Sequence, residues 1–132
     1  MKPSIVGLLA LIVLTGLSVV GSRAVHAQKI IAGSYIQQSG EDLYKSICQG
    51  CHMPDAKGAI GAGAYPALAN NARLMSALYP IAVVLNGQRA MPPFGADLSD
   101  AQIANVINYV RAHFGNHYKD SVSAAAVKAA RH

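Results

Sequence analysis

The sequence has 132 residues, of which 52% are hydrophobic, and a formal net charge of +5 at pH 7. This length favours a single domain. The basic residues are scattered, and no basic patch is interleaved with aromatic residues, so the positive charge does not indicate a nucleic-acid-binding protein.

The first 27 residues have the composition of a secretory signal peptide. Lys2 gives a short basic start, an apolar run covers residues 5–20, and Val25-His26-Ala27 resembles a signal-peptidase site. We therefore predict a Sec-type signal peptide at 1–27 and a periplasmic mature protein. The alternative is an uncleaved membrane anchor, for which the apolar run is slightly short.

Cleavage after Ala27 would leave a domain with a thin core. The remaining chain has nine basic and six acidic residues, no tryptophan and two phenylalanines. Small domains with so few large apolar residues usually need a disulfide, a metal or another staple. We therefore expect a bound group to contribute to the core of the folded protein.

A helix is expected to begin at Ser39, after an extended lead-in at residues 28–38. Ser39 can cap this helix, and Asp42 three residues later can return the hydrogen bond. Leu43 and Ile47 would share one face because they are four residues apart. The helix is predicted to continue to His52.

The end of this helix contains Cys48-Gln49-Gly50-Cys51-His52, the C-x-x-C-H pattern of c-type haem attachment. Two thiols at this spacing on a helical turn can form thioether bonds to the two vinyl groups of one haem. The imidazole of His52 then lies under the iron and can bind it. The pattern predicts one covalent haem c attached through Cys48 and Cys51, with His52 as an iron ligand.

Three other roles for the two cysteines are less consistent with the sequence. A thioredoxin-like C-x-x-C motif occurs in a βαβ context, and no strand pattern precedes Cys48. A structural zinc site needs four ligands, but the chain has two cysteines and its other histidines lie near the termini. A disulfide between Cys48 and Cys51 is possible, although so short a loop would stabilise the fold little.

The segment after the motif contains the expected hydrogen-bond partner of His52. Pro54 and the glycines of residues 58–64 break the helix. An iron-bound histidine needs an acceptor for its other ring nitrogen, and the carbonyl of Pro66 can supply one. Residues 70–86 predict one or two short helices that end at Gly87.

Met91 is the candidate for the second iron ligand on the opposite face of the haem. Pro92 and Pro93 hold the segment extended, which helps to place a thioether sulfur. Met53 adjoins His52 and cannot reach that face, and Met75 is expected to fill the core. The remaining histidines are expected to be solvated or to cap helix ends: His113, His117 and His132.

The clearest helix is predicted to run from Ser99 to Phe114. Ser99 and Gln102 form a capping box, and Gly115 ends the helix. Apolar residues recur at helical spacing: Ile103, Val106, Ile107, Val110 and Phe114. A tail at 116–132 contains a short helix after Ser123. No segment shows the alternation of a strand, so the predicted class is all-α.

These motifs together resemble a class I cytochrome c. The resemblance rests on Cys48-Gln49-Gly50-Cys51-His52, on Tyr65-Pro66-Ala67-Leu68, on residues 86–94 with Met91, and on the helix from Ser99 to Phe114. It covers residues 39–115, the expected cytochrome domain. The chain is also similar to the monohaem cytochrome domains in cytochrome subunits of periplasmic alcohol and aldehyde dehydrogenases.

The resemblance implies a fold in which the N- and C-terminal helices cross and short helices and loops wrap round one haem. Gly40, Tyr44 and Tyr109 would lie at the crossing, where the two tyrosines simply pack. His52 and Met91 would be the axial pair. Other residues would line or support the haem pocket: Leu68, Leu85, Phe94, Ile103 and Val106.

The implied function is electron transfer, and the chain itself is not expected to be an enzyme. Two strong axial ligands leave iron no open position for a substrate. The expected partners are redox proteins, namely a periplasmic dehydrogenase and a terminal oxidase, with membrane association through a partner or an uncleaved N-terminus. The alternative is a haem enzyme or sensor with a labile sixth ligand.

Overall fold

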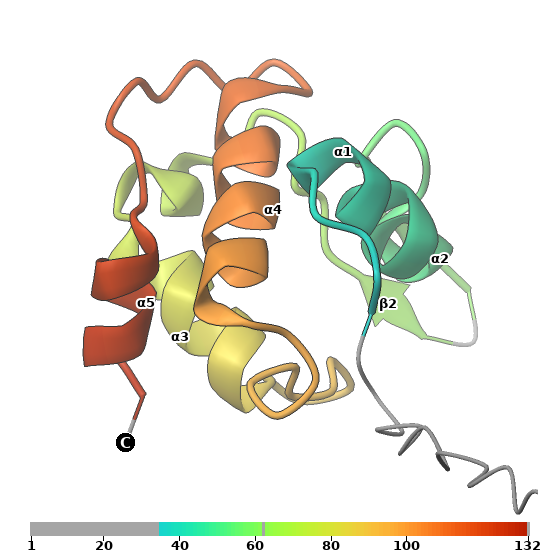
Figure 1. The fold of residues 1–132 in the computed structure, drawn as a ribbon. Coiled ribbons are helices and arrows are strands. Elements are labelled where there is room, and N and C mark those ends of the chain that lie inside the picture. The colour runs from blue at the N-terminus through green and yellow to red at the C-terminus, as the bar shows by residue number, and fades with distance from the viewer. Residues whose placement is uncertain (1–34, 62, 132) are drawn as a thin grey trace, which may run out of the picture. The chain divides into compact units, whose positions relative to one another are not determined.

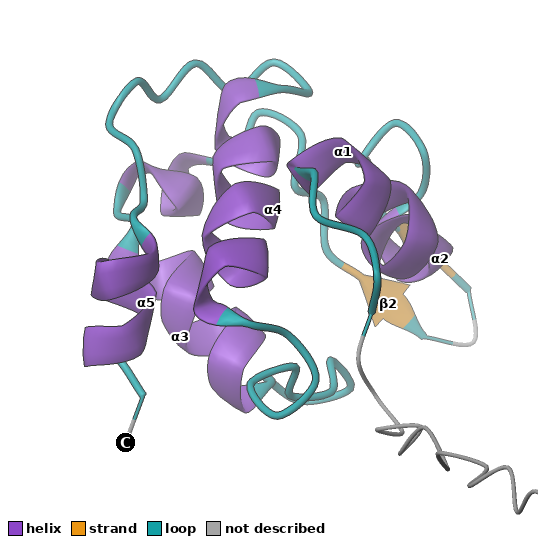
Figure 2. Ribbon diagram, in the orientation of Figure 1, coloured by secondary structure: helices purple, strands orange, loops and turns teal. Residues whose placement is uncertain are grey.

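The computed structural model describes residues 35–61 and 63–131. The predicted signal peptide at 1–27 and most of the lead-in lie outside the described residues. The described part is mainly helical, as predicted (Figure 2). None of its helices combines the length and the apolar character needed to cross a membrane.

The first helical run contains three consecutive elements: α1 (Gly40–Leu43), the π-helical turn η1 (Tyr44–Cys48) and α2 (Gln49–His52). Ser39 caps the run by accepting a hydrogen bond from the Asp42 amide at 3.1 Å, as predicted. The π-helical turn was not predicted. The Ser46 hydroxyl donates to the Asp42 carbonyl at 2.6 Å, and such a bond competes with the regular backbone ladder and bends helices.

A short antiparallel hairpin follows, formed by β1 (Ala59–Ile60) and β2 (Ala64–Tyr65). The expectation of no strands was therefore wrong for these four residues. Strands of two residues are too short for an alternating pattern to be detected. Gly58 permits the backbone before β1 to lie close to the backbone of Tyr65, because a Cβ atom there would lie 2.1 Å from the Tyr65 carbonyl oxygen.

Two short helices occupy the middle of the chain, as predicted. The 3₁₀ helix η2 (Ala72–Met75) is followed by α3 (Leu78–Asn86). Gly87 ends α3 with a φ angle of 72°, a conformation that favours glycine.

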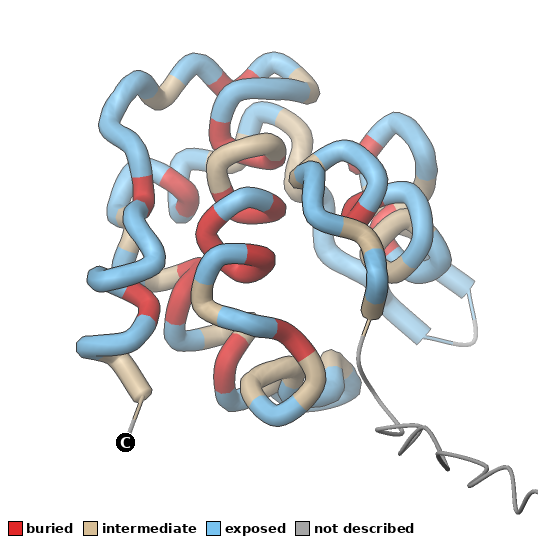
Figure 3. The backbone as a smooth tube through the Cα atoms, in the orientation of Figure 1, coloured by how far each residue is buried: buried red, intermediate tan, exposed pale blue. Residues whose placement is uncertain are grey.

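The helix α4 (Asp100–Ala112) lies between α1 and α5 in Figure 1 and contacts both of them. Its predicted capping box is present: the Gln102 amide donates to Ser99 Oγ at 3.2 Å, and the Ser99 amide donates to Gln102 Oε1 at 2.9 Å. Buried residues recur along α4 (Figure 3), so it forms the centre of the core.

The predicted end of this helix was wrong. The helix ends at Ala112 rather than at Phe114, because His113 is extended and Phe114 has a φ angle of 58°. Gly115 comes next with a φ angle of 79° and packs so closely on the Asn70 side chain that a Cβ atom would lie 2.2 Å from its Oδ1. The Asn70 amide also donates to the Phe114 carbonyl at 3.1 Å, so a loop that is distant in the sequence binds the chain just after the helix.

The crossing of α1 over α4 is confirmed. A Cβ atom on Gly40 would lie 2.2 Å from the Asn105 carbonyl oxygen and 2.7 Å from Tyr109 Cβ. The rings of Tyr44 and Tyr109 pack with their centroids 5.8 Å apart, and Phe114 lies 4.8 Å from Tyr44. Gly40 therefore permits a backbone contact that any larger residue would prevent.

The segment after α4 returns along that helix and ends in α5 (Ala124–Ala129). Asn108 donates to the Val122 carbonyl at 2.9 Å and accepts from the Val122 amide at 2.8 Å. Ser123 caps α5 as predicted, and Val127 is completely buried. The tail is thus packed against the core through both polar and apolar contacts.

Candidate functional site

The two cysteines lie at the C-terminal end of the first helical run, with Cys48 in η1 and Cys51 in α2. Both thiols are free, so the structure contains no disulfide between them. Burial, with a smaller contribution from the neighbouring Cys51, raises the pKa of the Cys48 thiol to about 12, whereas Cys51 is exposed. The pair is therefore available for a covalent attachment.

His52 is buried, with 8% of its surface exposed. Its Nδ1 lies 2.9 Å from the Pro66 carbonyl oxygen. A carbonyl oxygen only accepts, so Nδ1 carries the proton and donates, and the lone pair of Nε2 is left for a metal. The predicted contact between His52 and Pro66 is present.

Backbone hydrogen bonds hold the two partners of this contact together. The Gly58 amide donates to the His52 carbonyl at 3.1 Å, and the amides of Leu68 and Ala69 donate to the Ala56 carbonyl at 2.8 and 2.9 Å. Ala56 is completely buried and has a φ angle of 58°. Leu68 is half-buried against the core. The loop from His52 to Ala69 therefore closes on itself.

The hydrogen bond from the Tyr44 hydroxyl was not predicted from the sequence. The hydroxyl donates to the Met53 carbonyl at 2.7 Å, at the point where α2 ends and the Met53 φ angle is 67°. Burial is the main reason that the pKa of Tyr44 is raised to about 12, so the hydroxyl keeps its proton and remains a donor. The C-x-x-C-H motif, which begins four residues after Tyr44, is the sequence signal that could have suggested this role.

Met91 lies in the irregular segment between α3 and α4 and is half-buried. Its amide donates to the Gln88 carbonyl and its carbonyl accepts from the Gln88 amide, both at 3.0 Å. Gly87 lies against this turn, because a Cβ atom there would be 2.6 Å from the Met91 carbonyl oxygen. The backbone at Met91 is thus constrained by hydrogen bonds as well as by the two prolines that follow it.

The other methionines and histidines differ in their environments. Met75 is 70% exposed, so the expectation that it fills the core was wrong: η2 turns its side chain outward. His113 caps the end of α4, with its Nδ1 2.7 Å from the Tyr109 carbonyl oxygen. Met53 is half-buried at the end of α2. His132 lies outside the described residues.

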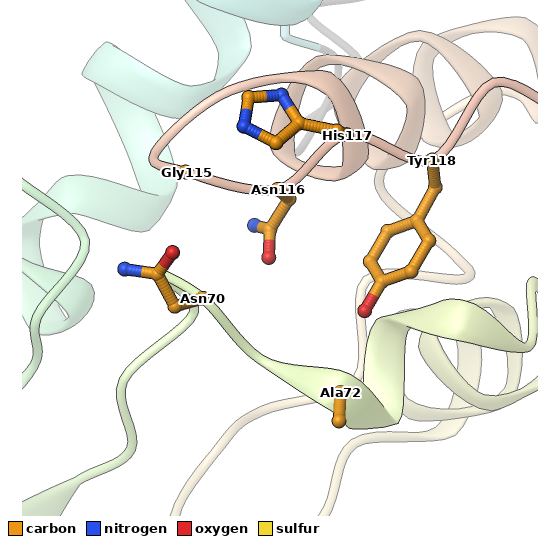
Figure 4. Close-up of a pocket in the computed structure, with 6 residues that line it drawn as sticks. All are labelled: Asn70, Ala72, Gly115, Asn116, His117 and Tyr118. Atoms are coloured by element: carbon orange, nitrogen blue, oxygen red, sulfur yellow. The ribbon is translucent and has the colours of Figure 1, made fainter.

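His117 lies at a shallow hollow of about 300 Å³. Figure 4 shows the Asn116 and Tyr118 side chains reaching towards the segment that contains Asn70 and Ala72. Asn116 Oδ1 accepts from the Asn71 amide at 2.9 Å, and the Tyr118 hydroxyl donates to the Asn71 carbonyl at 3.2 Å. These polar groups already bond one another, so the hollow is a structural junction.

The donors near the motif fit a haem and do not fit a zinc ion. Within residues 35–61 and 63–131, no three His, Cys, Asp or Glu side chains are grouped so that they could hold a metal. Two free thiols and one buried imidazole with its Nδ1 already bonded are the groups that covalent haem attachment requires. The residues present therefore fit a haem c.

Comparisons with known proteins agree with this chemistry. Residues 37–110 match the family model described as "Cytochrome C oxidase, cbb3-type, subunit III". The chain is 38% identical over 107 residues to the fructose dehydrogenase cytochrome subunit of Gluconobacter japonicus, which covers 70% of this chain and 22% of that protein. It is 31% identical to the gluconate 2-dehydrogenase cytochrome c subunit of Pantoea cypripedii, over 71% of this chain and 24% of that protein.

A smaller relative is covered almost completely. Cytochrome c6 of Bumilleriopsis filiformis is 35% identical over 74 residues, which are 55% of this chain and 86% of that protein. The dehydrogenase subunits, by contrast, are matched over less than a quarter of their own length. Residues 37–110, which match the family model, contain the C-x-x-C-H motif. The chain belongs to the cytochrome c family that this model describes.

Proposed function

We propose that this chain is an exported c-type cytochrome that carries single electrons through one covalent haem. Cys48 and Cys51 would form the two thioether bonds, and His52 and Met91 would bind the iron from opposite faces. The observation that carries the proposal is the 2.9 Å contact between His52 Nδ1 and the Pro66 carbonyl, because it leaves Nε2 free beside two free thiols in a cytochrome c domain.

Each protein group has a defined task in this proposal. The haem, when bound, supplies a reversible one-electron couple. The Pro66 carbonyl orients the imidazole of His52 and increases its basicity. The Met91 thioether would hold the iron, and a thioether ligand would raise its potential and exclude an external ligand. Pro66 and Leu68 would contact the cofactor from the loop that follows the motif.

Covalent attachment is tested by the mass of the denatured protein, expressed in a host that matures c-type cytochromes. We expect the mass of the mature chain plus one haem, and loss of that haem in the double variant Cys48→Ser, Cys51→Ser. A wild-type protein that releases its haem on denaturation would contradict the attachment.

Methionine ligation is tested by optical spectra of the oxidised protein. We expect the far-red sulfur-to-iron absorption in the wild type and its loss in Met91→Ala, together with a lower midpoint potential and rapid binding of CO to the reduced form. Met75→Ala is the matched control, because Met75 is 70% exposed. A Met91→Ala spectrum identical to that of the wild type would instead support a haem enzyme or sensor whose sixth ligand is another group.

The partners that we propose are a periplasmic dehydrogenase as electron donor and a terminal oxidase as the eventual acceptor. The support comes from relatives whose names are cytochrome subunits of fructose, gluconate and alcohol dehydrogenases. Pull-down of the tagged protein from detergent-solubilised membranes should recover a dehydrogenase. Cell fractionation should place the protein in the periplasm or at the periplasmic side of the membrane, and recovery in the cytoplasm would contradict export.

A further inference from the structure

Arg131, two residues after the end of α5, binds a segment that is remote from it in the sequence. Its Nε donates to Asp100 Oδ1 at 2.5 Å, its Nη2 donates to the Leu98 carbonyl at 2.9 Å, and its Nη1 donates to the Gly95 carbonyl. One guanidinium therefore binds three acceptors located 31–36 residues earlier in the chain.

These acceptors lie at the C-terminal end of the segment that contains Met91. The Gly95 amide donates to the Leu85 carbonyl at 3.1 Å, so the backbone of Gly95 is bonded to α3 on one side and to Arg131 on the other. Leu98, whose amide bonds the Phe94 carbonyl at 2.9 Å, is held by Arg131 in the same way. The opposite end of the segment is closed by the Gln88–Met91 bridge.

The environment of Arg131 makes the contact stronger than an ordinary surface ion pair. The side chains of Arg131 and Asp100 are only 32% and 27% exposed. Exposed ion pairs contribute little because water and salt screen them, whereas shielded hydrogen bonds from a guanidinium are among the stronger ones in proteins. The helix α5, which precedes Arg131, is fixed separately by the Ser123 cap and by the buried Val127.

We propose that Arg131 is a positioning residue for Met91. By tying Gly95, Leu98 and Asp100 together, the tail slows opening of the Met91 segment, keeps the methionine on the iron and delays the entry of external ligands. This inference rests on the proposed function, in which Met91 binds the iron. Arg131 lies outside the residues that match the family model, 37–110, so the tail adds this constraint to the cytochrome domain.

The test compares the ferric holoproteins of the wild type, Arg131→Gln and Lys128→Gln. Lys128→Gln removes the same charge from an exposed position of α5, three residues earlier in the chain, and is the matched control. We expect cyanide to bind Arg131→Gln roughly tenfold faster than the wild type, because three hydrogen bonds from a charged group are lost. The control should bind cyanide at the wild-type rate. Equal rates in all three proteins would overturn the proposal.

Two further measurements keep the result interpretable. Amide hydrogen exchange of residues 87–98 should be faster in Arg131→Gln, while exchange of residues 40–52 should be unchanged. Faster exchange in both segments would indicate general destabilisation and overturn the specific role.

Arg131→Lys keeps the charge but not the planar fork, so it should bind cyanide at an intermediate rate. A rate identical to that of the wild type would show that the fork is not needed.

The failure of the two proposals can be told apart. If the wild type lacks the far-red absorption, Met91 is not the ligand and the proposed ligation fails. If the wild type has that absorption but exchange of residues 87–98 is the same in Arg131→Gln, ligation stands and the positioning role of Arg131 is wrong.

Discussion

The helical run that carries Cys48 and His52 and the segment that carries Met91 are held in place in different ways. The first is a regular element whose position depends on a close crossing with α4 at Gly40 and on the short loop to Pro66. The second contains no helix, and the Arg131 side chain, from the distant tail, binds the backbone of Gly95 and Leu98. Regular geometry fixes one proposed ligand, and tertiary contacts fix the other.

The largest effect should come from Gly40→Val, which breaks the crossing beneath the cysteine motif. The new side chain would overlap the Asn105 carbonyl and Tyr109 Cβ, so we expect a loss of about 3 kcal/mol or more in the free energy of unfolding. Chemical denaturation of the holoprotein measures the loss. Gly50→Ala is the control, because a Cβ atom there meets nothing within 4 Å, and it should be close to neutral.

Arg111→Met should be the next largest change and acts on the other half of the molecule. The Arg111 side chain is 1% exposed and donates to the carbonyls of Leu74 and Met75 and to Asp120. Methionine would leave those two carbonyls without their donor, so we expect a loss of about 2 to 3 kcal/mol in the free energy of unfolding. Lys128→Met, at an exposed position of α5, should change the free energy much less; equal losses would contradict the role of Arg111.

Tyr44→Phe should cost less, because it removes one hydrogen bond and keeps the ring. We expect a loss of about 1 kcal/mol in the free energy of unfolding and faster amide exchange near Met53, whose carbonyl loses its donor. Tyr109→Phe is the control, since it removes a neighbouring hydroxyl and leaves the bond between Tyr44 and Met53 intact. Exchange that is unchanged in Tyr44→Phe would show that this hydroxyl does not hold the end of α2.

Asp120→Asn should have the smallest effect, and the effect should depend on pH. Hydrogen bonding from the Arg111 guanidinium lowers the pKa of Asp120 below its ordinary value of 3.8. The ionised carboxylate therefore stabilises the folded state above pH 3.8, and this contribution is lost as the pH falls through the lowered pKa. Denaturation curves should separate the variant from the wild type at neutral pH and converge in acid. A difference that persisted below both pKa values would contradict the assignment.

Much of the site nevertheless follows from local sequence. The C-x-x-C-H pattern placed Cys48, Cys51 and His52 on one helical turn, and the acceptor requirement of His52 pointed to Pro66. The cap at Ser39 and the box of Ser99 with Gln102 followed from spacing alone. Each of these features is made by residues close together in the chain or by a chemical requirement of one side chain, so the printed order of residues determines it.

Other features were decided only when distant segments packed together. Met75 was expected in the core, but η2 turns it outward and Arg111 uses its carbonyl. Gly115 was expected to end the last long helix, but α4 ends at Ala112 and Gly115 packs on Asn70. No local pattern in the tail predicts the contacts of Arg131 with Gly95 and Asp100.

Features that the sequence predicts and features that only packing decides differ for a physical reason. Haem attachment needs donor atoms at a fixed spacing on one turn, and a sequence of five residues specifies that spacing completely. The Met91 segment contains Pro92 and Pro93, which lack the amide donors of a regular ladder, so its backbone must find hydrogen-bond partners elsewhere in the fold. The sequence by itself determined where a haem is proposed to attach, whereas the tertiary structure decided which distant groups bind the C-terminal end of the Met91 segment.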